Sequence, residues 1–385
     1  MLVLKILLGI LLEIEIEIKS MSRPTEIMID LSALKHNLKQ IKNLVPHSKV
    51  MAMVKANAYG HGIEQISAAL KAADALGVAC SEEGLLLREA GIKNNIVLVE
   101  GLFHPDELSR AEKNKFTFVV HQIEQIEMLE KYNGPHTFSV WLKINTGMNR
   151  LGFLPEECMQ AFKRLMQCKA VKKPFGVMTH FAEADNKKDS ATQNQIALFQ
   201  EITTRFSSLT TEPFPKSLAN SAGILAWPKT HTDWVRPGIM LYGASPFENK
   251  IGEDHDLKPV MSLKSALIAI HDIKKNARIG YGGTYTAPHD MRIGVVAVGY
   301  GDGYPRHAKN GTPVLIHKKR CPLVGRVSMD MITVDLSSVE EAKIGDPVIL
   351  WGNGLPVETI AKHSDTIGYE LLTRITQRVY KNCTA

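Results

Sequence analysis

The chain lacks the cysteine pattern of a disulfide scaffold or a zinc site. Its five cysteines, Cys80, Cys158, Cys168, Cys321 and Cys383, are odd in number and irregularly spaced, and no two of them form a C-x-x-C pair. This usage is typical of a reducing compartment. We therefore expect a cytoplasmic protein that holds no structural metal.

Clustered charge and long apolar runs are also missing. The net charge is only +6, and no lysine- and arginine-rich stripe is present, which argues against a nucleic-acid partner and suits a small anionic ligand. The apolar residues 2–12 include one lysine and lack a cleavage site, and residues 13–19 alternate Glu and Ile, so the stretch is too short and too charged to cross a bilayer. We expect residues 1–20 to be a disordered extension from an upstream start codon or from expression design; a membrane anchor is the alternative.

The 385 residues, 44% of them hydrophobic, suffice for two domains with a large core. From residue 21, short β-rich runs alternate with amphipathic helical runs, which predicts βα units around a parallel sheet. Eight strands are expected, at residues 50–54, 77–80, 96–100, 116–120, 138–144, 175–180, 216–219 and 235–241. This count predicts a (β/α)8 TIM-like barrel over residues 21–245. A doubly wound sheet is the fallback, weakened because no G-x-G-x-x-G turn follows the first strand.

The pattern changes after residue 245. Residues 246–258 are polar with glycine and proline, and are interpreted as a linker. Strand-like runs dominate beyond it, at residues 262–270, 292–298, 313–316, 321–327, 331–335 and 347–350. They predict a mainly β C-terminal domain over residues 246–385. A first strand near residues 24–30 is a candidate to pair with the strands of this domain.

The stretch Met51–Gly62 ends an apolar run with one lysine and then turns. A lysine at a strand end usually extends into water. Here Asn57, Tyr59 and Gly60 follow Lys55 and supply more turn formers and phosphate-binding groups than a strand exit requires. In a desolvated pocket a neutral lysine amine attacks carbonyls, so Lys55 is a candidate for a Schiff base with pyridoxal 5′-phosphate (PLP).

Further polar side chains fall at the ends of the other expected strands. In a barrel these ends share one rim, where active sites lie. Each residue alone has a plain structural explanation, but polar residues at five strand ends of one rim favour a site. They are Lys55, Lys143 with Asn145, His180, Asn220 with Ser221, and the segment from Arg236 to Ile239.

Eight segments in order, from about Pro24 to the C-terminus, resemble the motifs of the alanine racemase family. They are Val54–Gly62, Leu142–Gly152, Thr179–Ala182, Ala219–Ala222, Val235–Gly243, Gly280–Tyr285, Gly299–Gly303 and Gly325–Asp330. The resemblance implies a PLP barrel with a β domain, working as a homodimer with shared sites. It also implies interconversion of L- and D-alanine, supplying D-alanine for peptidoglycan; a catabolic role stays open.

By this resemblance, Lys55 is both the PLP anchor and the base on one face of the substrate, and Tyr281 of the second subunit is the base on the other. A phenol with a pKa of about 10 needs cationic or hydrogen-bonding neighbours for that task. Arg236 faces the pyridine nitrogen, and His180 forms a hydrogen bond to Arg236 that adjusts its electrostatic effect. The other implied ligands are Tyr59, Asn220, Ser221, Gly238, Ile239 and Tyr369 for the cofactor, Arg150 for cofactor and substrate, Met329, Asp330, Tyr300 and Arg306 for the substrate and its entry, and Lys143 as a possible carbamate.

The chain departs from the family pattern at three positions. Aspartate is frequent in the family at the position of Asn145, glycine at that of Asn149 and cysteine at that of Ser328. None of these replaces a proposed base. The alternatives are a racemase of broader specificity and a non-enzymatic PLP-binding protein, and the second domain argues against the latter. A PLP decarboxylase would place a carboxylate where Arg236 stands.

Overall fold

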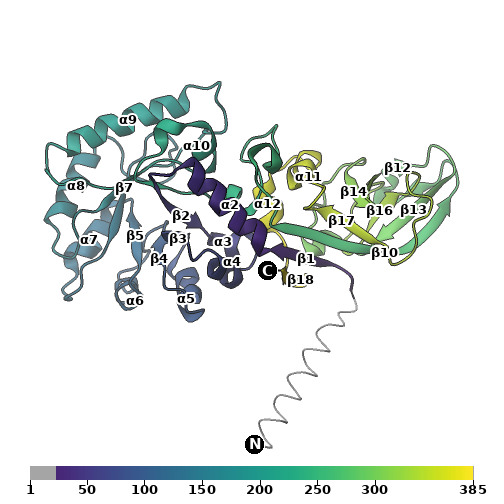
Figure 1. The fold of residues 1–385 in the computed structure, drawn as a ribbon, viewed down its shortest axis with the longest axis horizontal. Helices are drawn as coiled ribbons and strands as arrows, with labels where there is room; N and C mark the ends of the chain where they lie inside the picture. The colour runs from purple at the N-terminus through teal and green to yellow at the C-terminus, as the bar shows by residue number, and fades with distance from the viewer. Residues whose placement is uncertain (1–22, 385) are drawn as a thin grey trace, which may run out of the picture.

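The computed structural model describes residues 23–384, so the expectation for residues 1–20 lies outside the described part. An α/β barrel and a mainly β domain lie side by side, with α2 (Leu31–Leu44) and α12 (Gly368–Thr373) between them (Figure 1). Among residues 23–384, no helix combines the length and the apolar character that a membrane crossing needs.

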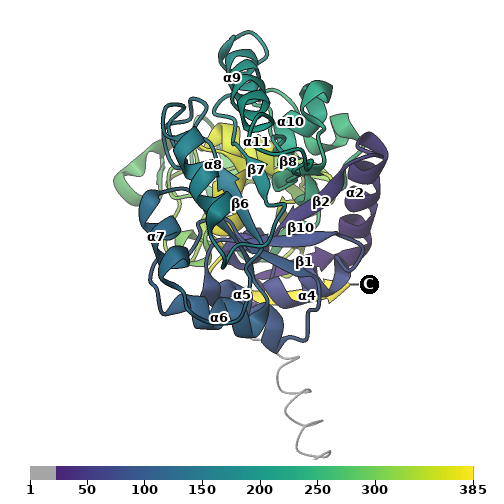
Figure 2. The same cartoon turned by 90° about the vertical axis from the view of Figure 1, so that its left-hand side faces the viewer.

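The barrel consists of eight parallel strands that close on themselves through the pairing of the first with the last, Lys49 opposite Trp234. Helices surround the strands (Figure 2), and this arrangement confirms the predicted (β/α)8 fold. The strands are β2 (Lys49–Met53), β3 (Ala75–Val78), β4 (Asn95–Leu98), β5 (Thr117–Val120), β6 (Val140–Lys143), β7 (Gly176–Met178), β8 (Lys216–Ser217) and β9 (Trp234–Val235).

The barrel strands are short and buried on both faces. All four residues of β3, of β5 and of β6 are buried, which explains why these strands appear in the sequence as continuous apolar runs. The helices that cover them each bury one face, as α7 does with Gln125, Ile126 and Leu129. They are α4 (Ile63–Ala69), α5 (Ser81–Glu89), α6 (Glu107–Asn114), α7 (Ile123–Lys131), α8 (Cys158–Gln167), α9 (Ala191–Phe206) and α10 (Ser221–Ala226), while α3 (Lys55–Tyr59) is a short turn at the end of β2.

The last barrel strand is shorter than the sequence suggests. Strand β9 ends at Val235, and the apolar residues expected to continue it form a 3-10 helix, η2 (Ile239–Tyr242). Pro237 has no N–H for a strand ladder, so the chain leaves the sheet there. This exit brings Gly238 and Ile239 onto the rim.

Helix α2 was not predicted, and it connects the two parts. It begins directly after β1 (Glu26–Asp30), where the Asp30 carboxylate accepts from the Ala33 N–H at 2.9 Å and caps the helix. The buried Asn37 donates to the carbonyls of Leu241 at 3.0 Å and Lys258 at 2.8 Å. One amide thus joins the barrel exit to the segment entering the β domain.

Strand β10 (Met261–Ile273) organises the β domain. It pairs antiparallel with β1, β13 and β17, while β18 (Tyr380–Thr384) lies parallel to β1. The N-terminal strand thus belongs to the same sheet as the last. The remaining elements are β11 (Arg278–Ile279), β12 (Tyr285–Thr286), β13 (Met291–Val296), β14 (Pro313–Ile316), β15 (Lys319–Pro322), β16 (Ile332–Asp335), β17 (Pro347–Trp351), α11 (Val357–His363), and the 3-10 turns η1 (Pro228–Thr230), η3 (Gly252–His255), η4 (Tyr281–Gly283) and η5 (Tyr300–Asp302).

Candidate active site

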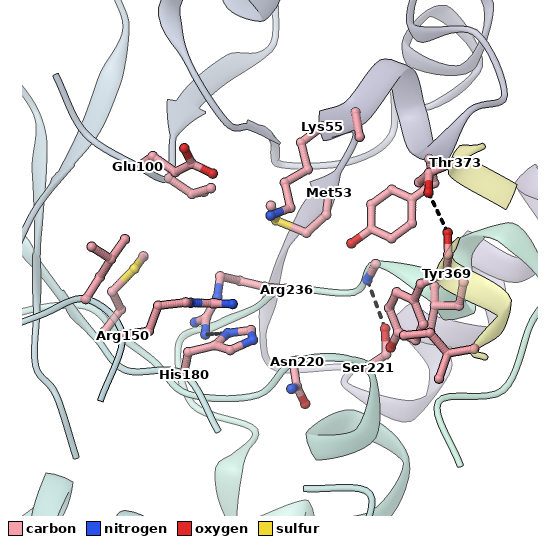
Figure 3. Close-up of a pocket in the computed structure, with 18 of the residues that line it drawn as sticks. Met53, Lys55, Glu100, Arg150, His180, Asn220, Ser221, Arg236, Tyr369 and Thr373 are labelled. Atoms are coloured by element: carbon pink, nitrogen blue, oxygen red, sulfur yellow. Dashed lines mark hydrogen bonds between the residues drawn. The ribbon is translucent and has the colours of Figure 1, made fainter. Parts of the chain in front are cut away.

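A cavity of about 760 Å³ opens at the C-terminal ends of the barrel strands. The polar residues that were expected at the rim line it together, except Asn145, and in Figure 3 the Lys55 amine extends into its middle. The expected site residues along its wall are Lys55, Tyr59, Lys143, Arg150, His180, Asn220, Ser221, Arg236, Gly238, Ile239 and Tyr369.

Lys55 begins an unusual turn. The four residues after it, Ala56 to Tyr59, all have φ near +53°, in the left-handed region, although none is glycine. Such backbone costs about 1–2 kcal/mol per residue and persists only where the surroundings enforce it. The turn directs both Lys55 and Tyr59 into the cavity.

Side chains outside the turn hold its backbone in place. The Glu83 carboxylate accepts from the Ala56 N–H at 2.7 Å and from the Ala79 N–H at 2.8 Å, which joins the turn to the next strand. The buried His61 places Nδ1 3.1 Å from the Ala58 carbonyl and 2.9 Å from that of Tyr59. Burial lowers the His61 pKa to about 4, so the ring is neutral and Nδ1 carries the proton that these carbonyls accept.

One end of the cavity is suited to a phosphate. Tyr59 stacks on Tyr242 with ring centroids 4.8 Å apart, and Ser221 Oγ accepts from the Gly238 N–H at 2.9 Å. A Cβ at Gly238 would lie 2.5 Å from the Tyr59 hydroxyl, so only glycine fits beside it. The Ile239 N–H has no acceptor within residues 23–384. Burial raises the pKa of Tyr59 to about 12, so its hydroxyl remains a donor.

Arg236 is buried at the opposite end and is fixed by main-chain and hydroxyl acceptors. Nη1 donates to Ser217 Oγ at 2.5 Å, and Nη2 donates to the carbonyls of Thr179 at 2.5 Å and Leu218 at 3.1 Å. Its Nε has no acceptor within residues 23–384 and remains available to a ligand. Although burial lowers the Arg236 pKa to about 10, the guanidinium stays charged at neutral pH.

His180 is neutral because of its surroundings. Burial, followed by the charge of Arg236, holds its pKa well below 6.5. Nδ1 lies 3.4 Å from Arg236 Nη2, and since a guanidinium only donates, Nδ1 accepts and the ring proton is on Nε2.

Lys143 is buried in a cationic wall. Burial, with further contributions from Arg236, Arg150 and Lys55, lowers its pKa to about 8. Two of the departures from the family pattern shape the adjoining loop. Asn145 Oδ1 accepts from the N–H groups of Gly147 at 3.1 Å and Asn149 at 3.0 Å, on the way to Arg150.

Sequence reasoning missed part of the wall. Glu100 contributes a carboxylate from the end of β4, and Ile367 and Thr373 of the α12 region cover one side. Glu100 falls at the end of an expected strand, as the other rim residues do. The argument that polar residues at strand ends share one rim could therefore have identified it. Tyr369 of α12 was expected only through the family resemblance, and its neighbours Ile367 and Thr373, more than 300 positions from Lys55, are marked by no local pattern.

The candidates from the β domain lie outside this cavity. Tyr281, Tyr300, Arg306, Met329 and Asp330 do not line it, and the side chains of Tyr281 and Met329 are 68% and 53% exposed. Their loops nevertheless meet one another. The Tyr300 N–H donates to the Ser328 carbonyl at 3.1 Å, and a Cβ at Gly280 would lie 3.2 Å from the Arg326 nitrogen.

No group of three or more His, Cys, Asp or Glu side chains within residues 23–384 is arranged to hold a metal ion. The site contains a lysine amine in its middle, hydrogen-bond donors that suit a phosphate, and a fixed arginine. Such a site can bind a phosphorylated carbonyl compound covalently.

Comparisons with known proteins agree with this chemistry. Two family models match, "Alanine racemase, N-terminal domain" over residues 29–246 and "Alanine racemase, C-terminal domain" over residues 260–383. Among curated relatives, the alanine racemase of Coxiella burnetii (strain RSA 493) is 49% identical over 91% of this chain and 96% of its own length. The biosynthetic alanine racemase of Escherichia coli K12 is 48% identical over 92% of this chain and 97% of its own length.

Two solved structures agree with the relatives. The biosynthetic alanine racemase of Pseudomonas aeruginosa superimposes with a TM-score of 0.90 at 41% identity, covering 94% of this chain and all of that one. The alanine racemase of Acinetobacter baumannii gives 0.87 at 43% identity, with the same coverage.

Proposed function

The chain belongs to the alanine racemase family, and from this membership we propose how its cavity interconverts L- and D-alanine with PLP. The activity is that of a PLP-dependent amino-acid racemase. The lysine at the centre of a phosphate-binding cavity is the observation that carries the proposal. The biosynthetic names of two similar proteins support a role in supplying D-alanine for peptidoglycan.

The residues present fit PLP. Tyr59, Ser221, Tyr369 and the free N–H of Ile239 would hold the phosphate, with Gly238 allowing close approach. Arg236 would donate from Nε to the pyridine nitrogen, and Lys55 would hold the aldehyde carbon through Nζ. When bound, PLP supplies a carbonyl for the substrate amine and an electron sink that acidifies Cα–H.

Two residues are proposed to move the Cα proton, one on each face of the substrate. Lys55 Nζ takes or returns it on one face, and the Tyr281 hydroxyl does so on the other. Arg236 cannot give up its proton at neutral pH, so it leaves the pyridine nitrogen without a full positive charge and favours rapid return of a proton to Cα. Arg150 holds the substrate carboxylate, assisted by Met329 and Asp330, while Asn220 adds a cofactor contact and Tyr300 and Arg306 line the entry.

A second copy of the chain is needed for this scheme. The cavity of one chain contains Lys55 and lacks Tyr281, and the Tyr281, Tyr300 and Met329 side chains are exposed on adjoining loops. A two-fold dimer brings the same patch of each subunit to the cavity of the other. We therefore propose a homodimer with two shared active sites.

The shared sites predict that two inactive variants rescue each other. Mixing Lys55→Ala with Tyr281→Phe after subunit exchange should restore about a quarter of wild-type activity, because half the dimers are hybrids with one intact site. The measurement is racemase activity before and after mild denaturation and refolding of the mixture. Each variant refolded alone is the control, and no recovery in hybrids isolated with two affinity tags would contradict shared sites.

Lys143 is proposed to be carbamylated, with the carbamate paired to Arg150. Its neutral amine would attack CO2, form an N–C bond and release a proton. With a pKa of about 8, the neutral fraction rises from about a tenth at pH 7 to about nine tenths at pH 9. Carbon-13 NMR of protein equilibrated with labelled bicarbonate should show a carbamate signal that grows over this range. The same signal in Lys143→Met would place the carbamate elsewhere.

One experiment tests the activity itself. Incubating the purified protein with L-alanine in heavy water, with and without PLP, should yield racemic alanine with deuterium at Cα only when PLP is bound. Parallel incubations with serine, lysine and arginine measure specificity, and turnover equal to that of alanine would indicate a broader racemase. A PLP-loaded protein that leaves L-alanine unchanged would be a carrier instead of an enzyme.

A further inference from the structure

A buried carboxylate lies beneath the loops that carry Tyr300 and Met329. Asp302, in η5, is fully buried, and its Oδ2 accepts from Arg23 Nη2 and from the Gly299 N–H, each at 2.8 Å. Its Oδ1 accepts from Arg378 Nε at 2.8 Å. One carboxylate thus holds two arginines from opposite ends of the chain and closes the η5 turn.

The same arginines hold the second loop. Arg378 Nη2 donates to Asp330 Oδ1 at 2.7 Å, and Arg23 Nη2 donates to the Asp330 carbonyl at 2.9 Å. Main-chain bonds join the loops directly, from the Gly301 N–H to the Met329 carbonyl at 2.9 Å. Two arginines and two carboxylates therefore form one charge-balanced group, the Asp302 network (Arg23, Asp302, Asp330 and Arg378).

The Asp302 network is anchored in the sheet. Arg23 precedes β1 and Arg378 precedes β18, and these strands run parallel with Glu26 opposite Tyr380. Thr376 adds two bonds to the η5 turn, from its N–H to the Asp302 carbonyl at 3.2 Å and from its hydroxyl to the Gly301 carbonyl at 2.9 Å. The loop backbone is fixed on several sides.

The side chains on this fixed backbone are exposed. Tyr300 and Met329 are 36% and 53% exposed, whereas Asp302 between them is inaccessible. A rigid backbone beneath exposed side chains is what a preorganised contact surface requires. Among the four members of the Asp302 network, only Asp330 is itself a proposed substrate contact, so Asp302, Arg23 and Arg378 act through others.

We propose that Asp302 and Arg378 are positioning residues that hold Tyr300 and Met329 in place over the substrate site of the partner subunit. This inference rests on the proposed racemase function and its shared sites. It predicts that loosening the network weakens substrate binding more than proton transfer, since Lys55 and Tyr281 lie on other segments.

Arg378→Gln is the variant of choice, because Arg378 is partly exposed and its loss leaves Asp302 paired with Arg23. We expect KM for L-alanine to rise about tenfold, the scale of a small misplacement of a binding group, while kcat of PLP-saturated enzyme changes less than twofold. Arg378→Lys keeps the charge but loses the forked contact to two carboxylates. Its KM should therefore lie between that of the wild type and that of Arg378→Gln. Asp302→Asn should raise KM further.

The matched control is Arg292→Gln in the same domain. Arg292, on β13, likewise makes two hydrogen bonds within the domain, but to the main-chain carbonyls of Glu340 and Ala342, and it bonds to neither loop. It should lose a similar amount of thermal stability and keep its KM. An unchanged KM in an active Arg378→Gln enzyme, or an equal rise in Arg292→Gln, would overturn the positioning role alone. A wild-type protein that does not racemise alanine would overturn the proposed function as well.

Discussion

Replacing Lys55 by alanine should lower the rate of alanine racemisation by about 10⁴-fold or more, because the variant loses the proposed covalent anchor of the cofactor and one of the two proposed bases together. Its Nζ is the group that extends into the middle of the cavity, on a turn whose left-handed backbone several contacts enforce. Borohydride reduction of wild-type protein followed by peptide mass spectrometry should find the pyridoxyl group on Lys55. The variant should carry no such adduct.

Two other lysines make this experiment selective. Lys49 begins β2, the strand that leads to Lys55, and is exposed beside Trp234 with Nζ 5.5 Å from the ring, so Lys49→Ala should keep full activity. Lys143 lines the same cavity and is the rival anchor. An adduct on Lys143, or racemisation by Lys55→Ala above about one per cent of wild type, would remove Lys55 from its proposed role.

The barrel could be predicted from the sequence because its strands are buried on both faces. Strands such as Val140–Lys143 stand out as apolar runs between helical stretches, and the rim residues follow from where those runs end. The eighth strand was overextended because the apolar segment after Pro237 fits a strand equally well. Pro237 marks where the strand ends, but that the following residues form η2 depends on packing against α2, which was itself missed.

The groups that support the site could not be predicted in this way. Glu83 lies in the first turn of a helix, where an acidic residue is usually a surface or dipole partner. Asp302 lies in a glycine-rich turn, and its two arginines are 279 and 76 positions away. Contacts over such separations depend on strand order, which periodicity does not encode. The left-handed turn after Lys55 is equally hidden, because four non-glycine residues there contradict local preference.

Loss of the Tyr281 hydroxyl should affect proton exchange at Cα of L-alanine and of D-alanine differently. Enantiomers have equal free energies, so kcat/KM must fall equally in both directions for Tyr281→Phe, by about 10²–10⁴-fold for loss of one acid–base group. The difference between the enantiomers appears instead in the rate at which the Cα proton exchanges with solvent. Lys55 should still exchange the Cα proton of D-alanine with solvent, whereas exchange from L-alanine should fall with the racemisation rate.

Proton NMR of each enantiomer in heavy water measures these exchange rates directly, with the optical rotation followed in parallel. Tyr285→Phe is the matched control, since Tyr285 lies four residues further along and packs on the Ile279 and Met291 cluster, so both rates should remain at the wild-type level. If Tyr281→Phe exchanged L-alanine as fast as D-alanine, a single base would serve both faces, and the exposed position of Tyr281 would need no partner subunit to explain it. Selective loss of L-alanine exchange assigns one face to each residue, and because no single chain brings Tyr281 to the Lys55 cavity, that result also requires the dimer.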